Sequence, residues 1–275
     1  MDEARLILTG STMDDARRLL ARGAKAPFLV RADRQTAGRG QRGRAWASPI
    51  GGAWTTTTAW VGPEPLPAWA MLGVAWEVLG VVQRALARSG AAAQACALRL
   101  KWPNDVTADG AHPALRGRLG GGLWKIAGIL GERDGEHVHV GVGVNANLGP
   151  ADLPAGTRLP AASLGMLGAG RVPIDQLCRQ IARAVVAALA PAHAAQPPAP
   201  GAMPPALLAS INQRLAWRGQ GVSLAPPDAD HGAAAGLTRG VLAGIDEHGR
   251  ALIAEHNAPL RAWSGGELSL AGPTP

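Results

Sequence analysis

Apolar residues recur along this chain with two different periods, and each period predicts a different kind of element. In the longest helical segment, Leu72, Leu79 and Leu86 repeat on one face, as expected for a helix packed against a core. The first helical segment opens with a Ser-x-x-Asp capping box at Ser11 and stops at Gly23. The predicted helices cover residues 11–22, 68–89, 174–189 and 205–217.

Alternation of apolar and polar residues predicts the strands. In segment 136–145 four valines share one face, while Gly141 and Gly143 lie on the other face and form a floor open to a ligand or to packing. In segment 97–102 the leucines face one way, so Lys101 points away from them. The remaining strands are predicted at residues 6–8, 27–32, 54–60 and 125–132. The glycine-rich stretch 107–124 is expected to be a loop.

The pattern changes near residue 217, after a proline-rich stretch at residues 191–205. Short strand-like pieces follow at residues 222–225, 237–245, 251–255 and 259–263, with a turn at residues 246–249. Short strands at such even spacing are typical of a small barrel or sandwich. The sequence therefore predicts a mixed helix-and-strand body, followed by a small all-β domain.

Composition narrows the class of protein without choosing a function. The chain has 275 residues, 47% of them hydrophobic and 17% charged, and a net charge of +7. These values fit a globular protein. Neither a secretory signal nor a run of ~20 apolar residues is visible, so a cytoplasmic location is expected. Cys96 and Cys178 have no metal or redox spacing, so both are expected to be buried thiols. The positive charge fits nucleic acid, an acidic protein or a phosphorylated ligand.

A loop at residues 36–44 concentrates the positive charge. Its anion-binding candidates are Gly38, Arg39, Gly40, Arg42, Gly43 and Arg44. Glycine lets the backbone approach a ligand, and arginine offers forked donors to phosphate or carboxylate oxygens. The glycines also spell the G-x-G-x-x-G dinucleotide fingerprint, but segment 45–52 carries a proline and two glycines where that motif requires a helix. We therefore expect an anion loop of another kind.

Two further motifs carry charged or amide side chains. The first, K-W-P-N-D, brings Lys101, Asn104 and Asp105 to the end of a strand, where an ordinary turn would explain them equally well. The second places Lys125 at the start of an apolar strand, with Gly128 three residues later. A buried lysine calls for an anionic partner, whereas an exposed one does not.

Other polar residues have simpler explanations. Ser11 and Thr12 open a helix, where capping is a sufficient reason for them. His137 and His139 share a strand face, but no third metal-binding residue lies at useful spacing, so a metal site is not predicted. Asn145 lies at a strand end, where asparagine usually serves a turn.

Taken together and in this order, the motifs S-T, Q-T-A-G-R-G-x-R-G-R-x-W, K-W-P-N-D, K-I-A-G-I-L, G-V-G-V-N-x-N and S-G-G-E-L-S-L closely resemble those of bacterial biotin protein ligases. The resemblance extends from Ser11 to Leu270. It implies an α+β fold, with a mixed-sheet catalytic domain at residues 1–217 and an SH3-like barrel at residues 218–275. It also implies formation of biotinyl-5′-AMP from biotin and ATP with Mg²⁺, and transfer of biotin to a lysine of a biotin carboxyl carrier protein.

The resemblance assigns roles to individual residues. The chemistry would involve Arg39, Lys101, Asp105 and Lys125. Biotin would be bound by Ser11, Thr12, Gln35, Gly38, Arg39, Gly40, Gln41, Lys125 and Gly128. ATP would be bound by Arg42, Arg44, Trp46, Lys101, Asn104 and Asn145. Asp105 is the candidate for orienting or deprotonating the acceptor lysine.

Two positions depart from the family pattern. Met13 stands where the family commonly has asparagine, so one amide contact to biotin is missing. Gln41 replaces an arginine of the loop, and we expect the adenylate to escape faster than from a Gln41→Arg variant. Equal release rates from the two proteins would contradict this expectation.

Only ten residues precede Ser11, so the resemblance predicts a ligase without specific operator binding, without membrane association and with an acetyl-CoA carboxylase carrier domain as its partner. Two alternatives remain at this point. The first is a lipoate–protein ligase, which shares the catalytic fold. The second is a basic nucleic-acid-binding module, whose arginine loop would contact phosphates without sequence preference.

Overall fold

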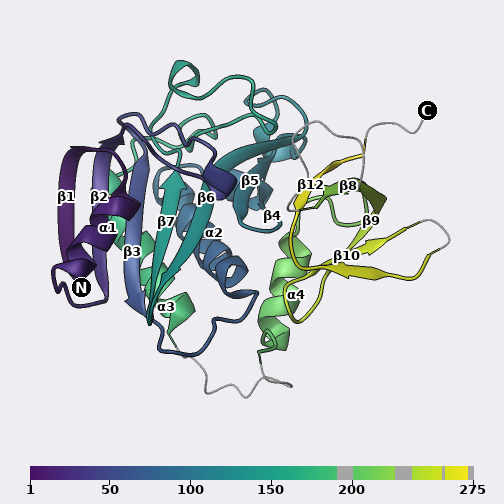
Figure 1. Cartoon of the computed structure of the whole chain (residues 1–275). Helices are drawn as coiled ribbons and strands as arrows, with labels where there is room; N and C mark the ends of the chain where they lie inside the picture. Colours follow the sequence, from purple (N-terminus) through teal and green to yellow (C-terminus); the bar gives the residue numbers. More distant parts are fainter. Residues whose placement is uncertain (191–200, 227–236, 256–257, 272–275) are drawn as a thin grey trace.

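A seven-stranded mixed sheet forms the larger part of the molecule (Figure 1). The computed structural model describes residues 1–190, 201–226, 237–255 and 258–271. The strand order is β1-β2-β3-β7-β6-β5-β4, with β1 and β2 parallel and the other neighbours antiparallel. The strands are β1 (Asp2–Thr9), β2 (Phe28–Gln35), β3 (Ala53–Trp60), β4 (Leu98–Lys101), β5 (Asp105–Asp109), β6 (Leu123–Asp134) and β7 (His137–Val144).

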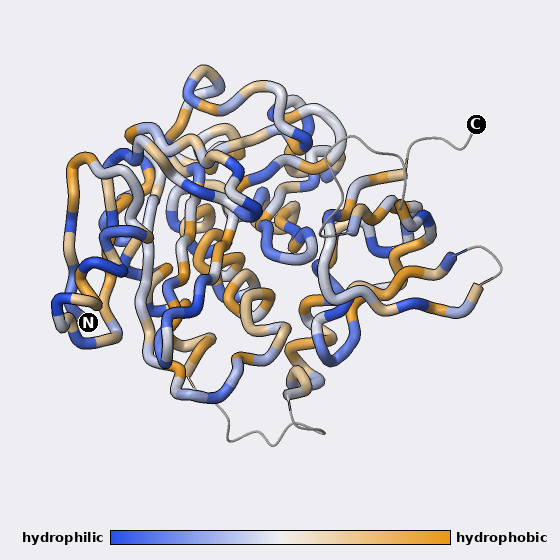
Figure 2. The backbone as a smooth tube through the Cα atoms, in the orientation of Figure 1, coloured by the Kyte–Doolittle hydropathy of each residue, from blue (hydrophilic) through white to orange (hydrophobic). Residues whose placement is uncertain are grey.

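Helices cover the two faces of this sheet unequally. The longer helices α2 (Ala70–Arg88) and α3 (Ile174–Leu189) pack against each other on the face that carries the β7 valines. Figure 2 shows apolar stretches along α2 and along the neighbouring strands. The short helix α1 (Thr12–Ala21) lies on the opposite, glycine-bearing face, where it contacts β2, β3 and β7. Much of that face is therefore left open for a cavity.

The second sheet has five strands in the order β11-β10-β9-β8-β12. Its strands are β8 (Gly221–Ala225), β9 (Thr238–Ile245), β10 (Ala251–Ala254), β11 (Arg261–Trp263) and β12 (Glu267–Leu270). Helix α4 (Pro205–Arg214) precedes it, and the next residues bind the first sheet, because the Ala216 amide donates to the Leu100 carbonyl at 2.7 Å. Figure 1 shows this smaller sheet beside the β4 edge, with β12 turned toward the larger one. The antiparallel sheet is consistent with the SH3-like expectation.

Several expectations about elements were wrong in detail. Ser11 precedes α1, but its side chain makes no capping hydrogen bond, so the capping box does not form. The expected loop at residues 107–124 begins as the second half of β5, whose Val106 and Ala108 are fully buried between β4 and β6. Strand β12 was not predicted as a strand. The helix expected over residues 205–217 ends at Arg214. Both cysteines are free thiols, but Cys96 is exposed and only Cys178 is buried as expected.

Helix α2 is long and apolar enough to cross a membrane by length and composition, contrary to the expectation that no such segment exists. Its most apolar window is 61% buried inside the chain, where it packs against α3 and the sheet. The expected strands, helices and loops otherwise fall close to the observed ones. The proline-rich stretch at residues 191–205 lies largely outside the described residues.

Candidate active site

A cavity of about 250 Å³ opens on the glycine-bearing face of the larger sheet. Strands β6 and β7 form its floor, and the start of α1 closes one end. The arginine-rich loop at residues 38–46 forms a wall. The smaller sheet contributes Glu267, Leu268 and Ser269 from β12. Residues from both sheets therefore meet at one cavity.

Glycines keep the floor low enough for large side chains to rest on it. A Cβ atom added at Gly143 would lie 2.7 Å from Trp46 Nε1, and one at Gly128 would lie 2.8 Å from Trp46 Cζ3. Farther along β7, a Cβ atom at Gly141 would lie 3.1 Å from Met13 Cε. Trp46 and Met13 thus pack directly on backbone, and the buried Trp46 Nε1 has no hydrogen-bond partner among the described residues. Such an atom is suited to a polar ligand group.

Hydroxyl and amide groups gather at the end of the cavity closed by α1. The Gln35 side-chain oxygen accepts from the Thr12 backbone amide at 2.8 Å and from the Thr12 hydroxyl at 3.0 Å. The Thr12 hydroxyl also lies 2.9 Å from that of Thr56 on β3. Gln35 donates through Nε2 to Ser48 at 2.9 Å, and Ser11 is buried beside them. This end can bind a small polar head group.

Two lysines mark the opposite end. Lys125 Nζ lies 2.7 Å from Asp105 Oδ1 and 4.9 Å from the centre of the Trp46 ring. Lys101 is buried, and its Nζ lies 5.4 Å from the centre of the Trp217 ring. Burial lowers the pKa of Lys101, and the nearby Asp105 and Glu267 carboxylates only partly oppose this effect. Both ammonium groups are placed to meet an anion.

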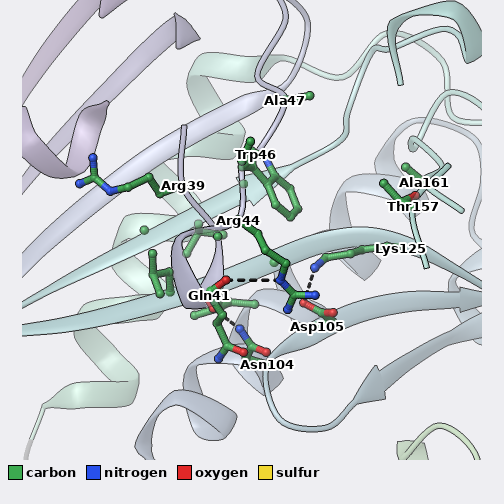
Figure 3. Close-up of a pocket in the computed structure, with 18 of the residues that line it drawn as sticks. Arg39, Gln41, Arg44, Trp46, Ala47, Asn104, Asp105, Lys125, Thr157 and Ala161 are labelled. Carbon is green, nitrogen blue, oxygen red and sulfur yellow. Dashed lines mark hydrogen bonds and ion pairs between the residues drawn. The ribbon is translucent and has the colours of Figure 1, made fainter. Parts of the chain in front are cut away.

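The arginines of the loop point in different directions (Figure 3). Arg44 extends toward Lys125 and Asp105, and it pairs with Glu267 at 3.2 Å. Arg39 points away from that group and makes two hydrogen bonds to Asp14 on α1, at 2.6 and 2.8 Å. Arg42 has a backbone φ of 58°, and its Nη1 lies 4.0 Å from Glu267. The loop is therefore held by carboxylates from two distant parts of the chain.

Glu267 on β12 is the centre of one of these ion-pair clusters. In addition to Arg44, it pairs with Arg158 at 3.1 Å, from the segment that follows the 3-10 helix η4 (Pro150–Asp152). Burial raises the pKa of Glu267, but Arg44 and Arg158 more than offset this, so the pKa lies below its usual range. Glu267 is therefore ionised at neutral pH and joins the small sheet to the cavity wall.

The structure brings most of the predicted site residues together. The predicted residues that line the cavity are Ser11, Thr12, Gln35, Arg39, Gly40, Gln41, Arg44, Trp46, Lys101, Asn104, Asp105, Lys125, Gly128 and Asn145. Gly38 and Arg42 do not line it. Gly38 lies against the loop's own backbone, where a Cβ atom would be 2.6 Å from the Trp46 carbonyl oxygen. Arg42 faces a second hollow on the other side of the loop.

The two asparagines also serve the backbone. Asn145 donates to the carbonyls of Lys125 and Ala162 at 3.3 and 3.2 Å, and Asn104 donates to that of Ile129. These bonds fix the edges of the cavity. They join the asparagines to carbonyls 17 to 25 residues away, so they are not the local turn bonds that were the alternative explanation for both residues. His139 is fully buried and hydrogen-bonded to Thr58, and the described residues contain no cluster suited to a metal.

Sequence reasoning missed several residues that line the cavity. Glu267 was visible only as part of the S-G-G-E-L-S-L motif, because its partners lie more than a hundred residues away. Arg158 had no sequence signal. Thr55 and Thr56 belong to a threonine-rich strand, but nothing indicated which face of it borders a site.

Comparison with known proteins agrees with this arrangement. Residues 7–147 match the model of the Biotin/lipoate A/B protein ligase family. The chain is 35% identical over 149 residues to the biotin–[acetyl-CoA-carboxylase] ligase of Mycobacterium tuberculosis, covering 53% of this chain and 49% of that one. It is 30% identical over 172 residues to the bifunctional ligase/repressor BirA of Bacillus subtilis, covering 59% and 46%. The chain thus spans about half the length of these curated relatives.

The fold is also similar to that of biotin protein ligase from Aquifex aeolicus, solved in complex with biotin and ATP. The TM-score is 0.74 at 21% identity, and the match covers 98% of each chain, so it includes both sheets. The chain therefore has the α+β fold of that structure. Because the family model matches half of its length, the chain belongs to the biotin/lipoate A/B protein ligase family.

Proposed function

We propose that this protein is an ATP-dependent biotin ligase. It joins biotin to ATP as biotinyl-5′-AMP, and then transfers biotin to one lysine of a biotin carboxyl carrier protein. The observation that carries the proposal is the cavity itself, in which a polar end at Thr12 and Gln35 is joined by a glycine floor to the cations Lys125, Lys101 and Arg44. A ligand with a polar ring, an apolar chain and a terminal carboxylate matches this order.

In the first step a biotin carboxylate oxygen attacks the α-phosphorus of ATP. A new oxygen–phosphorus bond forms, the bond to pyrophosphate breaks, and pyrophosphate leaves with the electron pair. Negative charge builds up on the α-phosphate and on pyrophosphate, and fixed cations at this point stabilise the transition state. Lys125 and Arg44 converge on this end of the cavity (Figure 3), and Lys101 also lines the cavity.

In the second step the acceptor lysine amine attacks the acyl carbon, an amide forms, and AMP leaves. The amine must first lose a proton. Asp105 lines the cavity and is held 2.7 Å from Lys125 Nζ. We assign Asp105 to orient the incoming amine and accept its proton. The carrier of acetyl-CoA carboxylase is the partner we favour, because relatives from Mycobacterium tuberculosis and Paracoccus denitrificans are named for that reaction.

Mg²⁺ would act with the nucleotide in this proposal. The carboxylates that line the cavity, Asp105 and Glu267, are both paired with cations of the chain. They do not form a cage for a metal ion. Mg²⁺ typically binds through substrate phosphates and a few ligands, so we expect it to arrive with ATP.

The test is incubation of the protein with a carrier domain, ATP, Mg²⁺ and either biotin or lipoate, followed by intact mass of the carrier. The expected result is a carrier heavier by one biotinyl group, and no product without ATP. Addition of lipoate instead would reassign the substrate within the family. Absence of both products from a folded protein would refute the proposal.

A further inference from the structure

Arg39 and Asp14 form a two-pronged ion pair at the side of the cavity. Arg39 Nη1 lies 2.8 Å from Asp14 Oδ2, and Nη2 lies 2.6 Å from Oδ1. This geometry uses one N–H donor on each terminal nitrogen of the guanidinium group, so the edge formed by Nη1 and Nη2 faces Asp14. The pair lowers the pKa of Asp14, so the carboxylate is ionised at neutral pH.

The pair also sets the direction of Arg39. Arg39 belongs to the cavity lining, whereas Asp14 does not. Figure 3 shows the guanidinium group turned toward α1 and away from Arg44 and Lys125, which face Asp105. The first arginine of the loop is therefore held apart from the cations at the other end of the cavity.

We propose that Asp14 is a positioning residue that holds Arg39 against α1, and that an anion which draws the Arg39 guanidinium group toward Lys125 and Arg44 must displace Asp14. This inference rests on the proposed function only for the identity of the anion, which is the carboxylate of biotin or a phosphate of ATP. Asp14 and the anion compete for the same edge of the guanidinium group, the one formed by Nη1 and Nη2. The protein therefore binds the anion more weakly than its number of arginines suggests.

Two neighbours make the exchange feasible. Arg17, one turn along α1, lies 3.3 Å from Asp14, so the carboxylate retains a cationic partner after Arg39 leaves. Asp14 also lies in the first turn of α1, where the helix dipole favours a negative charge. Both side chains of the Arg39–Asp14 pair are about one-third exposed or more, so water can replace each partner.

The experiment compares the wild-type protein with Asp14→Asn by calorimetric titration at one ionic strength. Biotin alone and ATP with Mg²⁺ are titrated separately, which distinguishes the two sources of the anion. We expect Asp14→Asn to bind at least one of them about two- to fivefold more tightly, the size expected for one partly exposed ion pair. Asp14→Glu restores the pair and is expected to return affinity toward the wild-type value.

Two controls separate positioning from a general effect of charge. Asp33→Asn removes a similar carboxylate, which pairs with Arg5 at 3.1 Å and does not line the cavity, and it is expected to leave both affinities unchanged. In an Arg39→Gln background, Asp14→Asn is expected to give no further gain. Unchanged or weaker binding by Asp14→Asn, or an equal gain in the Arg39→Gln background, would overturn the inference.

A second measurement does not depend on ligand. Asp14→Asn is expected to increase hydrogen exchange of the loop at residues 38–46, because Arg39 loses its anchor. Unchanged exchange would overturn the inference even if the protein bound neither biotin nor ATP. That binding failure would count against the proposed function instead, so the two ideas can fail separately.

Discussion

The floor and the rim of the cavity are built in different ways. The floor consists of Gly128, Gly141 and Gly143 on β6 and β7, and its shape follows from the alternation of side chains along paired strands. The rim consists of the loop at residues 38–46 together with Asp14 and Glu267. Ion pairs between residues that are far apart in the sequence hold the rim in place.

The glycines of the floor are fixed by packing, whereas an ion pair of the rim can exchange one partner for a ligand. A glycine under Trp46 has no substitute, because any Cβ atom there would lie less than 3 Å from the indole ring. A partly exposed ion pair contributes only about 1 kcal/mol or less, and a competing anion can replace one partner. The floor therefore determines which shapes fit, and the rim determines how firmly a charged ligand is held.

The largest effect is expected at Lys125, which stands on β6 and faces the rim. Lys125→Ala removes the cation beside Asp105, and the initial rate of carrier biotinylation is expected to fall by roughly 100-fold or more, as for loss of one transition-state donor. Lys25→Ala, at an exposed site, serves as the control. Biotinylation at a rate close to wild type would show that Lys125 does not contribute to the chemistry.

The sequence predicted the floor of the cavity but not the ion pairs of its rim. The valine and glycine alternation of β7 predicted the floor, and the helical period predicted α3 with its observed ends, because both patterns reflect local geometry. The hold of Asp14 on Arg39 and the pairs of Glu267 with Arg44 and Arg158 were not predictable from spacing. They depend on which segments meet in three dimensions, and ion pairs between distant segments leave no periodic trace in the sequence.

A second prediction tests the rigidity of the floor. In Gly143→Ala the new methyl group would meet Trp46 Nε1 at 2.7 Å, so the indole must lift from the sheet. Overpacking of this kind costs about 1 to 3 kcal/mol, and affinity for biotin is expected to fall about tenfold. Gly121→Ala is the matched control, because a Cβ atom there has no neighbour within 4 Å. Titration of both variants with biotin measures the difference in affinity. Equal affinities would mean that the floor accommodates the added methyl group without loss of biotin binding.

The third prediction concerns the rim. Glu267→Gln removes the charge that pairs with Arg44 and Arg158, and the free energy of unfolding is expected to fall by about 1 kcal/mol. Urea unfolding measures this free energy. Hydrogen exchange of the loop at residues 38–46 is also expected to increase. Glu255→Gln breaks an ion pair with Arg261 elsewhere on the small sheet and should leave the loop unchanged. If hydrogen exchange of the loop is the same in Glu267→Gln as in the wild type, Glu267 does not hold the rim in place.

The smallest effect is expected where the glycine face of β7 continues beneath α1 to His139. This side chain is fully buried, its Nδ1 lies 2.8 Å from the Thr58 hydroxyl, and burial lowers its pKa below 6.5 although Asp134 partly opposes the shift. Above pH 6.5 the imidazole is neutral in both the folded and the unfolded chain, so its contribution to stability is complete.

As the pH falls below 6.5, the unfolded chain binds a proton at this histidine before the folded protein does. The free energy of unfolding therefore decreases toward the lower, folded pKa, by at most about 1.4 kcal/mol per pH unit for one proton. Urea unfolding at several pH values measures this slope. His139→Gln is expected to reduce it, whereas His137→Gln, on the same face but partly exposed, should not. An identical slope in wild type and His139→Gln would show that protonation of His139 does not affect the stability of the folded protein.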